Sequence, residues 1–187
     1  LVSQTKYALG LDFGTESGRA VVVDVGSGQT VGSATYRYAD GVIDEKLPGT
    51  SIRLGPDWAL QNPADYLATL KQAVPEALKV AGVQADDVIG IGIDFTACTI
   101  LPTRADGTPL CFEAEWKGNP HAWTKLWKHH AAQPEADRIN AVAVERGEAW
   151  LPLYGGRISS EWLHSKTLQI LDESPDVYTA MDRIVEA

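Results

Sequence analysis

The segment DFGTESGR, which begins at Asp12, contains residue types that could hold a phosphate group and a metal ion. A carboxylate at the end of an apolar run, here Asp12, can bind hydrated Mg²⁺ while backbone N–H groups face phosphate oxygens. Gly14 lacks a Cβ and allows close approach, Thr15 and Ser17 offer hydroxyls, and Arg19 offers a cationic fork. These residues are also common in β-turns, and neither GxxxxGK[ST] nor GxGxxG occurs. Spacing alone therefore favours an ordinary turn over a phosphate site.

The surrounding pattern predicts that this segment joins two strands. Residues 7–12, 19–25 and 29–38 are rich in strand-forming residues and are separated by short polar turns, which predicts an antiparallel meander. Residues 40–57 contain Gly and Pro with little periodicity, so we expect a loop there.

A long helix is predicted next. Asn62 and Pro63 are typical of a helix start, apolar residues then recur every three or four positions as far as Ala81, and Gly82 is typical of a helix end. Pro75 lies inside this pattern and predicts a kink or a restart.

The remaining pattern predicts a mixed α/β fold. Residues 88–95 (VIGIGIDF) are nearly all apolar, as in a strand buried on both faces, and Asp106-Gly107 predicts a hairpin between residues 100–102 and 109–112. An α/β protein with a mixed sheet is the fold class that this order favours. The later elements are expected to be helices at 120–132, 134–146, 159–172 and 175–182, with a strand beginning at Arg183.

Composition narrows the classes of function. The chain has 187 residues, enough for one domain, and its 44% hydrophobic and 22% charged content is typical of a soluble globular protein. The net charge of −9 argues against a nucleic-acid surface, and there is no apolar run of membrane-spanning length. Cys98 and Cys111 lack metal-ligand spacing, which favours a reducing, cytoplasmic location.

The segment DFGTESGRAVVVD resembles the opening phosphate-loop hairpin of the FGGY carbohydrate kinases, which share the ribonuclease H-like fold of actin, Hsp70 and hexokinase. The resemblance implies a mixed central sheet with flanking helices, and it implies ATP and Mg²⁺ as cofactors. It implies that Asp12 lies near the metal and that Gly14, Thr15 and Arg19 lie along the phosphates. Glu16 departs from the pattern, because relatives often have a hydroxyl there.

Three further stretches resemble the sugar-binding wall of these kinases. The first is WALQNP before the long helix, and the second is GIDFTACT, where Thr96, Ala97 and Cys98 would contact the substrate. Glycerol kinases have an Arg-Glu pair at Ala97 and Cys98; small residues leave room for a larger sugar. The third stretch contains Trp116 and Tyr154, whose rings could pack on sugar C–H groups, although core packing is the competing interpretation.

The runs NPHAWTKLWKHHAAQPEADRIN and YGGRISSEW resemble the branch of this family that phosphorylates L-ribulose. That resemblance implies transfer of the ATP γ-phosphoryl group to the 5-hydroxyl of L-ribulose. The alternatives are another ketose or polyol kinase, such as a xylulokinase, and a non-catalytic actin-like nucleotide-binding module. The expected partners are a ketopentose and ATP, not nucleic acid or a membrane, and a homo-oligomer remains open.

The resemblance also implies that the machinery is incomplete. Residues 1–187 are expected to form the N-terminal domain, incomplete at its C-terminal end and without the second, nucleotide-binding domain. Leu1 is not an initiator Met, and the family's catalytic base, an Asp, is expected after Ala187. We therefore assign no catalytic residue to this chain and expect it to be inactive alone.

Three features are interpreted as structural. His129 and His130 are expected on a solvated helix face, because adjacent helical residues point about 100° apart and cannot easily share a metal ion. Lys125 and Lys128 are expected to extend from an amphipathic helix into solvent. Cys98 is expected to be an inert thiol, since no basic partner can be argued from the sequence.

Overall fold

The computed structural model describes residues 5–187, so the prediction about Leu1 lies outside the described residues. The chain divides into two compact units, one made of residues up to Gly41 with Asn62–Thr96 and the other of Val42–Gln61 with Ala97–Ala187. The prediction that the whole chain forms one incomplete N-terminal domain stays a prediction.

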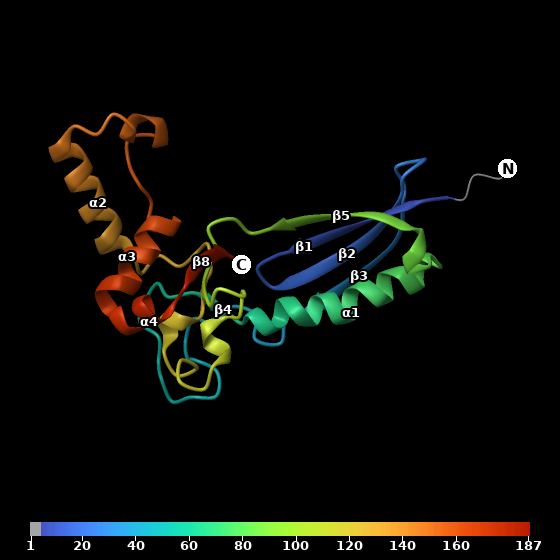
Figure 1. Ribbon diagram of the computed structural model, residues 1–187, viewed down its shortest axis with the longest axis horizontal. Coiled ribbons are helices and arrows are strands. Elements are labelled where there is room, and N and C mark those ends of the chain that lie inside the picture. The colour runs from blue at the N-terminus through green and yellow to red at the C-terminus, as the bar shows by residue number, and fades with distance from the viewer. Residues whose placement is uncertain (1–4) are drawn as a thin grey trace. The chain divides into compact units, whose positions relative to one another are not determined.

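The first unit contains a four-stranded mixed sheet (Figure 1). Its strands are β1 (Tyr7–Phe13), β2 (Ser17–Asp24), β3 (Thr30–Arg37) and β5 (Val88–Phe95), in the order β3-β2-β1-β5. Strands β1, β2 and β3 pair antiparallel, whereas β5 runs parallel to β1. The predicted meander and the predicted mixed sheet are both confirmed.

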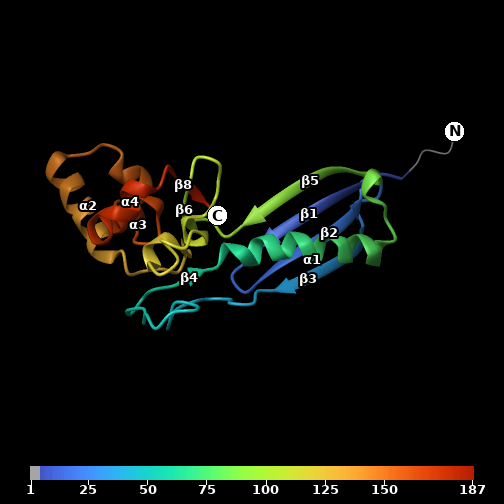
Figure 2. The same cartoon turned by 60° about the horizontal axis from the view of Figure 1, so that its bottom comes forward.

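Helix α1 (Pro63–Ala81) lies along this sheet, as Figure 2 shows. The Asn62 side chain accepts a hydrogen bond from the Ala64 N–H, and Gly82 ends the helix in the left-handed conformation with φ 66°. Both predicted ends are confirmed. Pro75 was predicted to cause a kink or a restart; the restart does not occur, because α1 is one continuous helix that is held by packing on the sheet.

Small residues let α1 approach the sheet closely. A Cβ on Gly18 would lie 2.4 Å from the Thr69 side chain, and one on Gly32 would lie 2.6 Å from the Ala77 carbonyl oxygen. Close approach of backbone to helix therefore requires glycine at both positions. The core beneath the helix consists of Leu9, Leu11, Ala20, Val22, Ala73, Ala77 and Val83.

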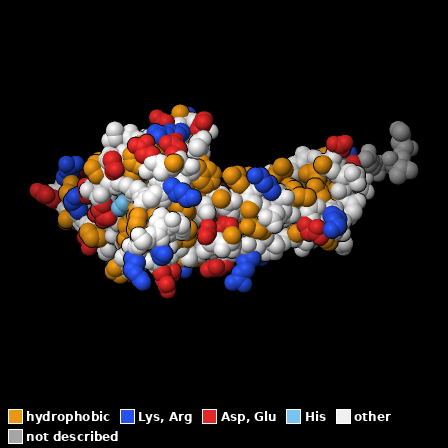
Figure 3. Space-filling view, turned by 90° about the horizontal axis from the view of Figure 1, so that it is seen from below, with side chains coloured by type: hydrophobic (Ala, Val, Ile, Leu, Met, Phe, Trp, Pro, Cys, Tyr) orange, Lys and Arg blue, Asp and Glu red, His pale blue; other side chains and the backbone are white. Residues whose placement is uncertain are grey.

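The prediction that residues 88–95 are buried on both faces is wrong. Ile89, Ile91 and Ile93 of β5 are 62–64% exposed. Hydrophobic side chains are also visible among charged ones on the face of the molecule that Figure 3 shows. The reason is topological: β5 is the edge strand beside β1, and α1 contacts β2 and β3 instead. An apolar run indicates side chains that favour burial, and among the described residues no element packs over the side chains of β5 to bury them.

The second unit contains another four-stranded sheet, in the order β4-β7-β6-β8, with every pair antiparallel. Its apolar core is formed mainly by Ile43, Leu47, Leu60, Ile100, Leu110, Cys111, Ala122, Trp123, Ile170 and Val177. Its elements are β4 (Leu60–Gln61), β6 (Ile100–Thr103), β7 (Thr124–Lys125), α2 (Gln133–Arg146), α3 (Leu163–Glu173), α4 (Pro175–Ala180) and β8 (Arg183–Glu186).

The helix predicted over residues 120–132 is wrong. Only Pro120–Ala122 forms a short 3₁₀ helix, and the chain then enters β7, where Lys125 pairs with both Leu60 and Ile100. Tertiary pairing between two other strands therefore overrides the local helical pattern. Other 3₁₀ helices are Ala85–Asp87, Leu110–Phe112 and Leu151–Tyr154.

The helices predicted after residue 133 are confirmed. The helices predicted at 134–146, 159–172 and 175–182 correspond to α2, α3 and α4, although α3 begins only at Leu163. The Asp106-Gly107 turn forms, with Gly107 at φ 89°, but residues 110–112 are a 3₁₀ helix and not the second strand of a hairpin. Among residues 5–187, no helix combines the length and apolar character that crossing a bilayer requires.

Candidate functional site

Two carboxylates lie side by side at the ends of β1 and β5. Asp12 and Asp94 occupy paired positions of these parallel strands, so their side chains point to the same face of the sheet. Arg19 pairs with Asp12 across β1 and β2, and its Nε lies 3.6 Å from Asp12 Oδ2. All three residues line one hollow of about 360 Å³, together with Gly10 and Gly92. Of the predicted phosphate-site residues, Asp12 and Arg19 are therefore brought together.

The turn that follows Asp12 is tightly closed. The Gly14 N–H donates a hydrogen bond to the Ser17 carbonyl oxygen at 3.0 Å, and a Cβ on Gly14 would lie 3.1 Å from that oxygen. Glycine is needed here for close approach inside the turn, and it does not adopt a positive φ. Thr15 lies half-buried next to it in the same turn. The hairpin thus holds the predicted phosphate-loop residues at the end of β1 that carries Asp12.

The donor set suits a hard cation that is completed by other ligands. Mg²⁺ is usually held by one or two carboxylates together with water and substrate phosphates, not by a cage made only of protein. Asp12 and Asp94 provide such a pair, and no group of three metal-ligating side chains occurs among residues 5–187. Asp94 Oδ1 also accepts the Phe95 N–H at 3.0 Å.

The predicted substrate loop follows β5. The Thr96 N–H donates to the Phe13 carbonyl oxygen at 3.2 Å within the first unit, and Ala97 and Cys98 begin the second segment of the other unit. Ala97 is exposed, and its backbone N–H and carbonyl have no hydrogen-bond partner among the described residues. Cys98 has φ 62°, an unusual value for a residue with a side chain. The loop therefore presents the backbone polar groups of Ala97 without a hydrogen-bond partner among the described residues.

The Cys98 thiol is not activated. Its pKa is raised, first by burial and then by the nearby Glu186 carboxylate, and these effects outweigh the opposing influence of Lys166. A raised pKa keeps the sulfur as a thiol at neutral pH. The sequence-based interpretation of Cys98 as an inert residue agrees with this direction.

The two predicted aromatic contacts lie in different surroundings. Trp116 packs against the apolar core of the second unit, and its buried indole N–H has no acceptor among the described residues. Tyr154 is half exposed, and its ring contacts Trp150 and Trp162 at centroid distances of 6.1 and 5.5 Å. It lines a cavity of about 350 Å³ whose lining includes neither Trp116 nor Cys98. That cavity therefore does not bring the predicted contacts together.

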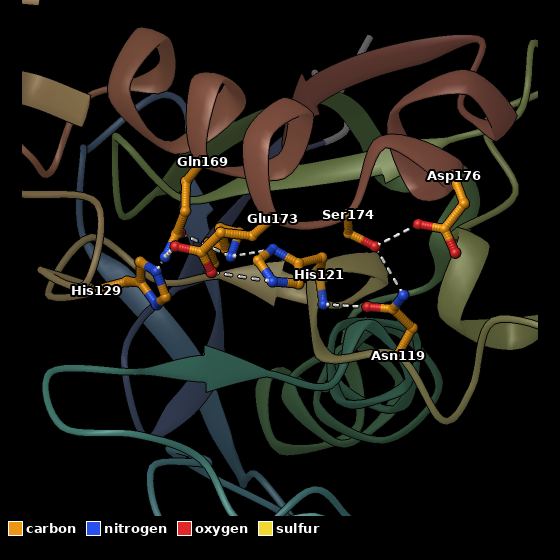
Figure 4. Close-up of polar contacts among 8 residues, drawn as sticks. Asn119, His121, His129, Gln169, Glu173, Ser174 and Asp176 are labelled. Atoms are coloured by element: carbon orange, nitrogen blue, oxygen red, sulfur yellow. Dashed lines mark hydrogen bonds and ion pairs between the residues drawn. The ribbon is translucent and has the colours of Figure 1, made fainter. Parts of the chain in front are cut away.

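A buried polar network in the second unit was not predicted. Lys125 is fully buried, and its Nζ lies 3.1 Å from Gln169 Oε1, 3.4 Å from His121 Nδ1 and 4.2 Å from the centroid of the Trp58 ring. His129 is also fully buried, and its Nε2 lies 2.9 Å from the same Gln169 oxygen. Figure 4 shows both histidines directed toward Gln169 and Glu173 of α3.

The predictions for His129 and Lys125 are therefore wrong. Both were expected on a solvated helix face, but the segment is an extended strand and turn enclosed by α3 and Trp58. The intervals of four residues between His121, Lys125 and His129 imitate helical periodicity. No pattern in the sequence indicates that these polar side chains point inward.

Burial shifts the pKa values in this network. It lowers the pKa of His121 to about 3 and that of His129 to about 2, and in both cases the Lys125 charge acts in the same direction. The pKa of Lys125 falls to about 7, chiefly through burial, with Glu173 opposing that shift. His129 Nδ1 accepts the Ala59 N–H at 3.3 Å, so the neutral ring carries its proton on Nε2. Both histidines are thus neutral at pH 7.

Comparison with known proteins places these features in a family. The chain is 57% identical over 183 residues to a ribulokinase of Halalkalibacterium halodurans and 58% identical over 182 residues to one of Mycolicibacterium smegmatis. These matches cover 98% and 97% of this chain but 32% of each relative, so the chain spans about a third of their length. No family model matches the chain.

The fold comparison points the same way. The solved structure of a xylulose kinase from Rhodospirillum rubrum matches with a TM-score of 0.74 at 18% identity, over 97% of this chain and 32% of that one. The expected ribonuclease H-like α/β fold is thereby confirmed. The chain belongs to the FGGY family of carbohydrate kinases and corresponds to the N-terminal part of a ribulokinase-like protein.

Proposed function

We propose that the intact protein transfers the γ-phosphoryl group of ATP to the 5-hydroxyl of L-ribulose in the cytoplasm, and that this chain supplies the phosphate loop and one wall of the sugar site. The proposal rests chiefly on the Asp12–Asp94 pair, with Arg19 beside it, at strand ends of a chain that is 57% identical to a ribulokinase. Ligands commonly bind at such strand ends in α/β sheets.

Asp12, assisted by Asp94, would hold Mg²⁺ at this position. The ion would neutralise charge on the phosphates of ATP. Arg19 is 61% exposed in its side chain and can reach outward to phosphate oxygens, whereas Gly14 and Thr15 form the turn against which those oxygens would lie. Electrostatic positioning is the contribution that phosphoryl transfer requires from these residues.

Ketose recognition is assigned to the loop of Thr96, Ala97 and Cys98, with Trp116 and Tyr154 as aromatic contacts. The backbone groups of Ala97 lack hydrogen-bond partners among the described residues, so they are available to sugar hydroxyls. The small side chains leave the space that a five-carbon ketose needs. The buried Trp116 N–H adds a donor that has no partner among residues 5–187.

The described residues include no group that we assign as the base for the 5-hydroxyl. The chain spans about a third of its curated relatives, and we infer that catalysis requires the remaining length. ATP consumption by the intact protein, measured with a panel of ketopentoses and polyols, tests the proposal. Preference for L-ribulose supports it, whereas preference for D-xylulose or a polyol, or ATP binding without any response to sugar, contradicts it.

Asp12→Asn provides the matching test of the phosphate site. Removing one charge from the carboxylate pair should lower kcat by about 100-fold or more, because electrostatic stabilisation is the main contribution of such a site. The control is Asp24→Asn, which changes a carboxylate at the far end of β2 and should leave kcat within about twofold. Equal activity of both variants would contradict the role of Asp12.

A further inference from the structure

The peptide group between Cys98 and Thr99 is held from both sides by charged side chains. Its carbonyl, that of Cys98, accepts a hydrogen bond from Lys166 Nζ at 2.6 Å. Its N–H, that of Thr99, donates to Glu186 Oε2 at 2.9 Å. A cation from α3 and an anion from β8 therefore fix one peptide plane at both ends.

Lys166 is itself anchored. Its side chain is fully buried, and Nζ also donates to the Leu126 carbonyl oxygen at 2.7 Å. The Leu126 N–H bonds in turn to the Ala59 carbonyl oxygen, so the ammonium group joins the loop to the sheet of the second unit. Burying an ammonium group is costly unless hydrogen bonds compensate, and here two backbone carbonyls provide them.

The conformation that this arrangement maintains is an uncommon one. Cys98 has φ 62°, in the left-handed region that residues with a Cβ rarely occupy. Strained backbone persists only where surrounding contacts enforce it, and such positions cluster at functional sites. With the 98–99 peptide group turned toward Lys166 and Glu186, the neighbouring backbone groups of Ala97 are left unpaired among the described residues.

We propose that Lys166 and Glu186 are positioning residues that lock the Cys98–Thr99 peptide and thereby determine how tightly and how selectively the loop binds a ketose. The inference rests on the proposed role of this loop in sugar binding. Neither residue needs to touch the sugar, because each acts through the backbone. Without the lock, Cys98 can relax toward negative φ, and the Ala97 groups change direction.

The kinetic test uses the intact kinase. Lys166→Met removes the donor at similar volume, and Glu186→Ala removes the acceptor at an exposed position where folding is not at risk. Each variant should raise KM for the ketose by about 10-fold, as expected when a charged hydrogen bond is lost, with KM for ATP within about twofold. Discrimination between L-ribulose and D-xylulose should fall in both variants. Glu186→Gln, which keeps an acceptor oxygen, should lie between Glu186→Ala and the unmodified enzyme.

The matched control is Lys125→Met. Lys125 is as deeply buried as Lys166 and lies in the same unit, but its contacts are Gln169, His121 and Trp58, not the loop. The Lys125→Met variant should keep KM for the ketose within about twofold of the value of the unmodified enzyme. An equal rise in Lys125→Met and Lys166→Met would overturn the proposal, as would an unchanged KM in both Lys166→Met and Glu186→Ala.

Hydrogen exchange separates this inference from the proposed function, since it needs no substrate. In the intact kinase, exchange of the Thr99 amide, followed by mass spectrometry, should accelerate about 10-fold or more in Lys166→Met and Glu186→Ala but not in Lys125→Met. If the unmodified enzyme prefers another sugar, the proposed substrate is wrong, and the KM comparison is made with the preferred sugar. Unchanged Thr99 exchange in both loop variants would exclude the lock itself.

Discussion

The two units are stabilised in different ways. The first, around β1, β2, β3 and α1, has a core of aliphatic side chains into which the helix is set closely at Gly18 and Gly32. The second encloses two lysines and a histidine with no exposed surface, Lys125, Lys166 and His129. Five buried side-chain polar atoms have no hydrogen-bond partner among the described residues, and four of them lie in the second unit. We therefore expect the stability of the first unit to depend mainly on side-chain volume, and the stability of the second unit to depend mainly on pH.

Acid should affect the second unit most. His121 and His129 have folded pKa values of about 3 and about 2, below the unfolded value of 6.5. As pH falls below 6.5 the unfolded chain takes up protons that the folded chain excludes, so stability falls. At pH 5 the loss is about 2 kcal/mol for each histidine. Hydrogen exchange of peptides from each unit, compared at pH 7 and pH 5, measures this loss of stability.

A double variant checks the source of that acid sensitivity. Replacing His121 and His129 by glutamine should remove most of the pH dependence between 6.5 and 5 in the second unit. Peptides of β1, β2 and α1 serve as the internal control, because no histidine lies in residues 5–41 or 62–96. Equal loss of protection in both units at pH 5 would contradict the comparison.

Added side-chain volume should lower the stability of the first unit more than that of the second. Gly32→Ala would place a Cβ 2.6 Å from the Ala77 carbonyl oxygen and 2.7 Å from the Ala81 nitrogen, both of them backbone atoms of α1. Overpacking of this kind should cost about 2–3 kcal/mol. Gly90→Ala is the matched control in the same sheet, because its Cβ would meet no atom within 4 Å and should change stability by less than about 0.5 kcal/mol. Urea denaturation of the two variants gives the difference.

Lys125→Met should have a smaller effect, visible mainly in alkali. The folded pKa of Lys125 is about 7 and the unfolded value is 10.5, so between these values the unfolded chain binds more protons and stability rises with pH. Methionine should flatten that rise and change stability at pH 7 by no more than about 1 kcal/mol, since an apolar replacement of similar volume is tolerated. Melting temperatures from pH 7 to 10 test this. An unaltered slope would show that Lys125 is not the titrating group.

The smallest stability change is expected for Trp116→Phe. This substitution removes a buried N–H without a partner among the described residues, so stability should change by less than about 1 kcal/mol. If the N–H serves the ketose, KM for the sugar should nevertheless rise in the intact kinase. Trp123→Phe is the control, because its Nε1 already donates to the Lys117 carbonyl oxygen at 3.0 Å. It should lose stability without a change in KM.

Local signals were sufficient where neighbouring residues decide the structure. Asn62, Pro63 and Gly82 marked both ends of α1, and the polar turns marked the meander, because caps and turns depend on a few adjacent residues. The pairing of Asp12 with Asp94 was not predicted. It depends on the register between β1 and β5, which are more than seventy residues apart in the chain.

The sequence by itself determined the family, the phosphate-loop hairpin and the helix that follows it. Only the tertiary structure decided that β5 lies at an exposed edge, that residues 124–125 form a strand, and that Lys125, His129 and Lys166 point inward. The physical reason is that burial of a polar side chain is decided by partners distant in the chain. Lys166 can be buried because its Nζ donates hydrogen bonds to the carbonyl oxygens of Cys98 and Leu126. The residues of α3 near Lys166 in the sequence do not indicate these two contacts.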